Sequence, residues 1–256
     1  MLHSDAAAPA RDLSRADVVI ATDLDGTFLG GSPAQRQPLY AWIERQRHRV
    51  GLIFVTGRSL DRVAPLIADP DVPSPDLVIA DVGASLAWSD LRPIAALEQR
   101  VRGAWPGRDR VATLFDDILR DGDLTVQDVP QRGRLSFLAH APEVVATVRA
   151  RARAHDFHVI YSCDRFLDVL PTGVDKGRSL QVLLEHAGIA DDRVLVCGDT
   201  LNDEALYRRA WRGVVVGDAE PALVEATRGR PDVHHATSPG AAGIAEALTL
   251  LFGESI

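Results

Sequence analysis

The chain has 256 residues, of which 46% are hydrophobic and 25% are charged. This length and composition support a sizeable apolar core, in one large domain or two small ones. The formal net charge of −8 argues against nucleic acid or an anionic membrane surface as the main partner. No apolar run reaches the roughly 18 residues of a membrane span, and the two cysteines suggest no secreted disulfide framework. We therefore expect a cytoplasmic protein.

Residues 1–16 lack the apolar centre of a signal peptide, so we expect a flexible leader there. The chain then alternates between apolar runs typical of buried strands and segments with helical spacing. This alternation predicts an α/β fold, a Rossmann-like parallel sheet with helices on both faces. The expected strands are 17–24, 51–57, 76–88, 193–200 and 212–219. The expected helices are 38–50 (opened by Pro38), 59–70, 177–189, 202–210, 220–229 and 240–254.

The segment 89–170 has a different pattern and predicts a small α+β module inserted into the α/β core. Half-exposed strands are expected at 123–129 and 133–140, followed by a basic amphipathic helix at 143–156. Two more strands are expected around a turn at 162–165. The predicted domains are therefore a core formed by residues 17–88 and 171–256, and an inserted module at 89–170.

Polar side chains follow three of the predicted core strands. Asp23 and Asp25 end the first strand, Thr56 ends the second, and Asp199 and Asp203 follow a later one. Since ligands of parallel α/β sheets bind beyond the carboxyl ends of the strands, these residues should meet at one edge. A carboxylate cluster is costly unless a cation neutralises it, and oxygen-only ligands favour Mg²⁺ over zinc.

Carboxylates, a hydroxyl and a nearby lysine suit the transfer of a phosphoryl group. Asp23 can attack phosphorus and form an aspartyl-phosphate, and Asp25, two residues on, can act as general acid and then general base. Thr56 and Lys176 would hold the phosphoryl oxygens. Asp199 and the Asp25 backbone carbonyl would complete the metal site. Asp203 would bind the metal through water or anchor Lys176.

The sequence resembles the haloacid dehalogenase superfamily of aspartyl-phosphate phosphatases. Four motifs occur in the family's order: "DLDGT", "VTGR", "DKG" and "GDTLND". The resemblance implies a Mg²⁺-dependent phosphatase in which the module at 89–170 is a type-two α+β cap that determines substrate specificity. It implies metal binding by Asp23, Asp25, Asp199 and Asp203. It implies phosphate binding by Thr56, Gly57 and Lys176.

Further phrases look like sucrose-phosphate phosphatase and its bacterial relatives: "IADVGASL", "GRLSFLAH", "VIYSCDRFLDVLP" and "SPGAAGIAEAL". This resemblance implies a phosphorylated substrate of the type of sucrose 6-phosphate, mannosylfructose phosphate, glucosylglycerol phosphate or trehalose 6-phosphate, and a functional pairing with a glycosyltransferase. Many relatives have lysine where Arg134 stands, and a guanidinium offers different donors to a sugar. The expected substrate-binding residues are Arg58, Arg134, Ser136, Ser162, Asp164, Arg165, Asp168 and Asn202.

Several interpretations stay open at this point. Trp88, near the expected junction of core and cap, could stack on a sugar, although packing in the core is the simpler role for a tryptophan. A broad hexose-phosphate phosphatase is the rival within the superfamily. A non-catalytic domain that binds a sugar phosphate and supports a glycosyltransferase is the rival from another class. The Asp23 and Asp25 pair argues against this second rival, because a binding module needs no nucleophile.

Overall fold

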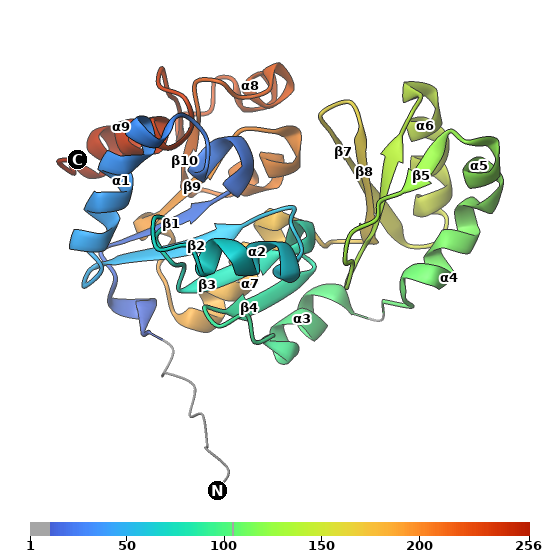
Figure 1. The fold of residues 1–256 in the computed structure, drawn as a ribbon, viewed down its shortest axis with the longest axis horizontal. Coiled ribbons are helices and arrows are strands. Elements are labelled where there is room, and N and C mark those ends of the chain that lie inside the picture. Colours follow the sequence, from blue (N-terminus) through green and yellow to red (C-terminus); the bar gives the residue numbers. More distant parts are fainter. Residues whose placement is uncertain (1–10, 104) are drawn as a thin grey trace, which may run out of the picture.

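The computed structural model describes residues 11–103 and 105–256, which form two β-sheets (Figure 1). The larger sheet has the strand order β11-β10-β9-β1-β2-β3-β4, with every neighbouring pair parallel except β3 and β4. The α/β class predicted from the sequence is confirmed. The strands are β1 (Val18–Thr22), β2 (Val50–Val55), β3 (Leu77–Ala80), β4 (Ser85–Trp88), β9 (Val194–Gly198), β10 (Arg212–Val215) and β11 (Val233–His235).

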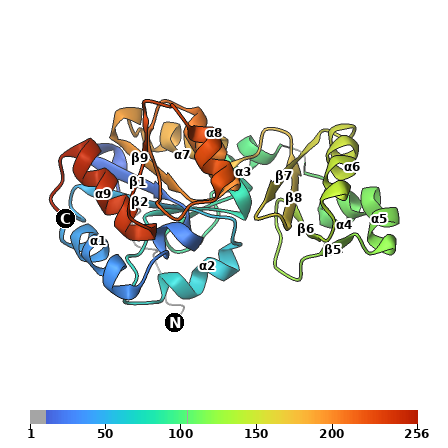
Figure 2. The same cartoon turned by 90° about the horizontal axis from the view of Figure 1, so that it is seen from above.

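Helices cover both faces of the larger sheet (Figure 2). Val19 and Ala21 of β1 pack into the apolar cluster under α3, α7 and α8, whereas Val18 and Ile20 pack into the cluster under α1, α2 and α9. Because successive strand residues face opposite sides, a strand buried on both faces reads as a continuous apolar run. The helices are α1 (Pro33–Arg45), α2 (Leu60–Ile67), α3 (Ala95–Arg102), α7 (Lys176–Ala187), α8 (Pro221–Thr227) and α9 (Gly240–Phe252).

Several boundaries differ from the prediction. Helix α1 begins at Pro33 behind a capping box at Ser32, and Pro38 lies inside the helix instead of opening it. The expected strand 76–88 is a hairpin, β3 and β4, joined by a turn in which Asp81 and Val82 have positive φ angles. The expected helix 202–210 is a 3₁₀ segment, Leu201–Arg208, and the three-residue β11 was too short to predict.

The inserted segment forms the smaller, antiparallel sheet, with strand order β5-β6-β8-β7. Its strands and the helix 143–156 were predicted, but α3 and the short helices α4 and α5 were not. Helix α3 packs into the core cluster under the larger sheet, whereas the other elements form their own apolar cluster. The core and cap limits at residues 88 and 171 stay predictions. The elements are β5 (Leu124–Val126), β6 (Leu135–Ala139), β7 (Phe157–Ser162), β8 (Phe166–Pro171), α4 (Arg108–Ala112), α5 (Asp116–Asp121) and α6 (Pro142–Arg153).

The end of the predicted flexible leader is folded onto the core. Leu13 and Ala16 are buried in the cluster beneath the larger sheet. The guanidinium of Arg193 donates hydrogen bonds to the carbonyls of Ser14 and Ala16. The leader prediction is therefore wrong for residues 11–16, because their apolar side chains find a place under the sheet, and residues 1–10 lie outside the described part of the chain.

The helices of the structure are short, and the longest, α1 and α9, have 13 residues each. Within 11–103 and 105–256, no helix combines the length and the hydropathy needed to cross a bilayer.

Gly240, the first residue of α9, is a position where only glycine fits. Its φ is +48°, and a Cβ there would lie 2.3 Å from the carbonyl carbon of Gly30 in the loop that follows Asp23. Gly240→Ala should lower the free energy of unfolding by about 2 kcal/mol or more, since a left-handed φ and overpacking each cost roughly 1–3 kcal/mol. Urea denaturation measures this change.

Gly253→Ala is the matched control for that substitution. Gly253 follows the same helix with a φ of +71°, but a Cβ there would meet nothing within 4 Å. It should therefore cost only the left-handed backbone, about 1 kcal/mol. Equal losses in the two variants would contradict the close approach of α9 to the Gly30 loop.

Candidate active site

The site lies where β1 ends, at the centre of the larger sheet. Asp23 follows Thr22 directly, and its backbone N–H donates to the carbonyl of Cys197 in β9, 2.9 Å away. This bond holds the Asp23 carboxylate at the sheet edge, and the residue is only 5% exposed. The carboxyl ends of β1, β2 and β9 thus converge, as the strand order predicted.

Lys176, the first residue of α7, is fully buried between two carboxylates. Its Nζ donates to Asp23 Oδ1 and to Asp203 Oδ1, at 2.6 Å each. Helix α7 can come this close because Gly177 has no side chain, and a Cβ there would lie 2.1 Å from the Ala205 carbonyl. Burial alone lowers the pKa of Lys176, but Asp203 and Asp23 outweigh it and raise that pKa above its ordinary value.

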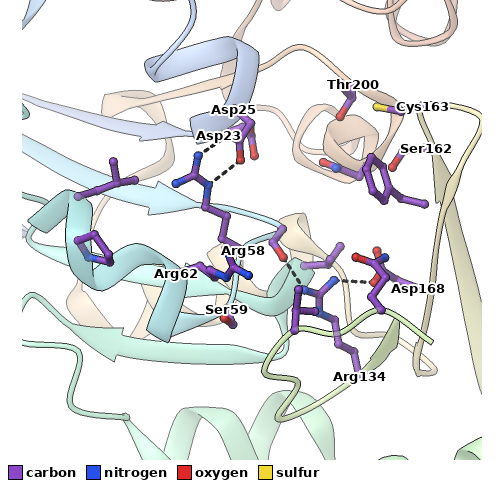
Figure 3. Close-up of a pocket in the computed structure, with 18 residues that line it drawn as sticks. Asp23, Asp25, Arg58, Ser59, Arg62, Arg134, Ser162, Cys163, Asp168 and Thr200 are labelled. Atoms are coloured by element: carbon purple, nitrogen blue, oxygen red, sulfur yellow. Dashed lines mark hydrogen bonds and ion pairs between the residues drawn. The ribbon is translucent and has the colours of Figure 1, made fainter. Parts of the chain in front are cut away.

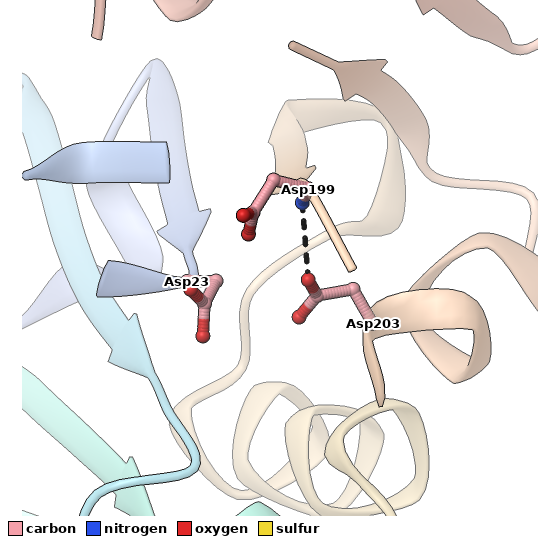
Figure 4. Close-up of side chains that lie close together, drawn as sticks. All are labelled: Asp23, Asp199 and Asp203. Atoms are coloured by element: carbon pink, nitrogen blue, oxygen red, sulfur yellow. Dashed lines mark hydrogen bonds between the residues drawn. The ribbon is translucent and has the colours of Figure 1, made fainter. Parts of the chain in front are cut away.

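Asp199 brings a third carboxylate to the cluster (Figure 4). One oxygen from each of Asp23, Asp199 and Asp203 lies within 4.8 Å of the others. Burial, followed by repulsion from Asp203, raises the pKa of Asp199 to about 7, and burial raises the pKa of Asp23 well above its ordinary value despite the nearby Lys176. The single ammonium does not balance the three carboxylates.

These residues fit a hard divalent cation. The donor set consists of oxygen atoms only, and the one ammonium of Lys176 faces three carboxylates. The backbone N–H groups of Asp199 and Thr200 both donate to Asp203 Oδ2, at 3.1 Å, and Thr27 Oγ1 donates to Asp199 Oδ1 at 2.9 Å. These bonds orient the carboxylates before any cation binds.

Asp25, two residues after Asp23, points to a different partner. Its carboxylate forms a bidentate ion pair with the guanidinium of Arg58, in which Nε lies 2.8 Å from Oδ2 (Figure 3). The Asp25 side chain is more exposed than that of Asp23 and lies outside the three-carboxylate cluster. Asp25 lines the cavity described below, and its expected role as a general acid stays a prediction.

Thr56 and Gly57 follow β2, the strand next to β1. Thr56 is fully buried, and its Oγ1 accepts a hydrogen bond from the backbone N–H of Arg58 at 3.1 Å. Gly57 lines the cavity described next, and its carbonyl accepts from Arg134. The phosphate-binding roles expected of Thr56, Gly57 and Lys176 stay predictions.

A cavity of about 770 Å³ opens in front of Asp23 and Asp25, between the larger sheet and the inserted module (Figure 3). Its size falls in the range of pockets that enclose a small organic ligand. The core and the inserted module contribute opposite walls of this cavity. Its lining residues are Asp23, Asp25, Gly57, Arg58, Ser59, Arg62, Pro65, Leu66, Val82, Gln127, Val129, Arg134, Ser162, Cys163, Phe166, Asp168, Thr200 and Asn202.

Arg134 joins the two walls of this cavity. Its buried guanidinium donates to Asp168 Oδ1 at 2.5 Å in the smaller sheet, and to Asp81 Oδ1 at 3.2 Å and the Gly57 carbonyl at 2.7 Å in the core. Burial raises the pKa of Asp81 although Arg134 opposes that shift. Lysine has no planar fork and could not reach three acceptors in this way.

The expected substrate-binding residues lie in three places. Arg58, Arg134, Ser162, Asp168 and Asn202 line the cavity. Ser136 is buried behind it, where its hydroxyl donates to Asp168. Asp164 and Arg165 lie in the turn between β7 and β8 and are absent from the cavity lining in the described structure.

Sequence reasoning missed several residues of the cavity. Ser59 is 3% exposed, and within the described residues its hydroxyl has no hydrogen-bond partner, as is also true of the Asn202 side-chain oxygen. Such orphaned buried atoms are expected where a ligand supplies the partner. Arg62 lies in α2 of the core, and Phe166 lies in β8 of the smaller sheet. Both were missed because residue spacing along the chain does not indicate that these two elements face one another across the cavity.

Two solved phosphatase structures share the fold of this chain. The structure aligns with the sucrose-phosphatase of Synechocystis sp. PCC6803 at a TM-score of 0.84 and 24% identity, over 93% of this chain and 98% of that one. It also aligns with a haloacid dehalogenase superfamily phosphatase from Bacteroides thetaiotaomicron at a TM-score of 0.64 and 16% identity, over 97% and 99% of the two chains. At these identities the likeness concerns the fold.

The amino-acid sequence identifies the family of the chain. The profile of the sucrose-6F-phosphate phosphohydrolase family matches residues 16–251, and the chain belongs to this family. It is 45% identical to glucosylglycerol-phosphate synthase of Pseudomonas anguilliseptica, over 90% of this chain but only 30% of that protein. It is 31% identical to mannosylfructose-phosphate phosphatase of Agrobacterium fabrum, over 90% of this chain and 95% of that one.

Removal of the Arg134 guanidinium should destabilise the protein. Arg134→Met leaves the buried carboxylates of Asp81 and Asp168 without their cation, which should lower the free energy of unfolding by roughly 3–5 kcal/mol. Urea denaturation followed by circular dichroism measures the loss. Arg228→Met, at the exposed pair with Glu225, is the control and should cost less than about 1 kcal/mol. Equal losses would show that the bridge contributes nothing beyond a surface ion pair.

Proposed function

We propose that the chain hydrolyses the phosphate monoester of a small glycosylated sugar or osmolyte through an aspartyl-phosphate intermediate. The observation that carries this proposal is the buried Asp23 carboxylate, held by Lys176 beside two further carboxylates at the floor of a cavity that could hold a sugar. Mg²⁺, bound by Asp23, Asp199, Asp203 and the Asp25 backbone carbonyl, would neutralise the carboxylates and polarise the phosphoryl oxygens.

The side chains divide the reaction into two steps. Lys176 holds one oxygen of Asp23, and the other attacks phosphorus while the bond from phosphorus to the leaving sugar oxygen breaks. Asp25 gives its proton to that oxygen, so Arg58 must first release the carboxylate. Asp25 then takes a proton from the water that attacks the aspartyl-phosphate, which frees inorganic phosphate and restores Asp23. Lys176 and Thr56 stabilise the charge on the transferred group.

Within this class we favour glucosylglycerol phosphate as the substrate. The 45% identical relative is named a synthase of that compound, yet the region shared with this chain is a phosphatase-family region that covers 30% of it. The phosphatase-family region of that synthase is explained if it removes the phosphate from glucosylglycerol phosphate, the compound that the synthase is named for. The chain would then act together with a glycosyltransferase that supplies its substrate. Mannosylfructose phosphate is the second candidate, because that relative matches over nearly its whole length.

The nucleophile is tested by Asp23→Asn. Phosphate release from glucosylglycerol phosphate with Mg²⁺ should fall by at least about a thousandfold, because an amide cannot form the covalent intermediate. Asp192→Asn, an exposed carboxylate away from the cavity, is the control and should keep the wild-type rate. If folded Asp23→Asn released phosphate as fast as the wild type, the mechanism would be wrong. A wild type that binds but never releases phosphate would favour the non-catalytic domain.

A substrate panel separates a specific enzyme from a broad hexose-phosphate phosphatase. The panel holds glucosylglycerol phosphate, mannosylfructose phosphate, sucrose 6-phosphate, trehalose 6-phosphate, glucose 6-phosphate and fructose 6-phosphate. The preferred glycosyl phosphate should exceed both hexose phosphates in kcat/KM by more than tenfold, about 1.4 kcal/mol of discrimination. Values within tenfold across the panel would support the broad phosphatase instead.

A further inference from the structure

Phe166 is an exposed aromatic ring in the lining of the cavity. Of the described residues that line the cavity it is the one aromatic, and it lies on β8 of the smaller sheet, in the wall opposite α2. Its relative exposure is 39%, whereas the neighbouring Leu167 is fully buried. An exposed large apolar side chain in a concave site indicates an apolar ligand surface.

The strand places this ring beside the polar groups of the cavity. Because strand residues alternate between faces, Phe166 and Asp168 face the cavity, whereas Leu167 and Val169 pack into the apolar cluster of the smaller sheet. Asp168 in turn holds the guanidinium of Arg134. The wall therefore presents an aromatic face next to a buried, charged hydrogen-bonding group.

A sugar ring matches this combination of surfaces. A pyranose has an apolar face formed by its C–H bonds and a rim of hydroxyl groups, so it can lie flat on an aromatic ring while its rim bonds to polar groups. The guanidinium of Arg165 lies over the Phe166 ring, 6.0 Å from its centroid. A sugar would take the face of the ring that Arg165 leaves open.

Trp88 does not fill this role. It packs against the apolar cluster under the larger sheet and lines a separate small cavity with Leu13 and Leu77. The Trp88 indole thus packs against the core, which is the simpler of the two roles considered from the sequence.

We propose that Phe166 is a specificity-determining residue, which stacks on the C–H face of the substrate's glycosyl ring and so selects glycosylated phosphates over those without a ring. This inference rests on the proposed function, because it assumes that the substrate's phosphate lies at Asp23. To the proposed function it adds that a pyranose ring of the substrate lies against the inserted module.

The test compares glucosylglycerol phosphate, which has a sugar ring, with glycerol 3-phosphate, which has none. Phe166→Ala should reduce kcat/KM at least fivefold more for glucosylglycerol phosphate than for glycerol 3-phosphate, mainly through KM. Phe166→Trp should restore the preference, whereas Phe166→Leu, which keeps an apolar side chain without a π face, should not. Leu250→Ala, an exposed apolar residue outside the cavity lining, is the control and should leave the ratio of the two substrates unchanged.

The outcomes are distinct. An unchanged ratio in Phe166→Ala, or an equal loss for both substrates, would overturn the stacking role, as would full restoration by Leu. Binding of glucosylglycerol phosphate to Asp23→Asn and to Asp23→Asn/Phe166→Ala, measured by calorimetry, separates the two proposals. Weaker binding in the double variant supports stacking even if the wild type released no phosphate, in which case only the proposed function would fail. Equal binding in both would overturn stacking even with an active enzyme.

Discussion

The buried ammonium of Lys176 is the contact on which the rest of the active site depends. It lies 2.6 Å from a carboxylate oxygen of Asp23 and the same distance from one of Asp203, with no exposure to solvent. Without it the two acids would be buried charges of one sign, which a protein interior does not tolerate. With it they stay close to Asp199, and the oxygen donors and remaining negative charge of the cluster fit a divalent cation.

A second buried cation links the two parts of the fold. Arg134 binds the core through Asp81 and the Gly57 carbonyl, and the smaller sheet through Asp168. Arg134 and Asp168, which line the cavity, therefore also connect the smaller sheet to the core. The proposed nucleophile and metal ligands lie in the core, whereas Arg134, Phe166 and Asp168 of the cavity lie in the inserted module, so the proposed chemistry and the proposed selectivity have separate structural sources.

The sequence was most informative where one physical requirement decides the pattern. A strand buried on both faces must be apolar throughout, so β1, β2 and β9 could be predicted from the chain alone. Elements with weak patterns were missed, among them the short β11, α4 and α5, whose few residues carry too little periodicity. Pro38 was misread because proline is tolerated within α1, which begins at Pro33 behind a Ser32 capping box.

The sequence by itself determined which carboxylates meet. Asp23, Asp25 and Asp199 could be placed at one edge because the strand ends of a parallel sheet must meet there, whatever the loops do. Only the tertiary structure decided what faces them. The pairing of Asp25 with Arg58 depends on the conformation of the loops after β1 and β2. The bridge from Arg134 to Asp81 and the exposure of Phe166 to the cavity depend on how one sheet lies against the other. Contacts between residues distant in the chain leave no periodic trace, because packing rather than local conformational preference sets them.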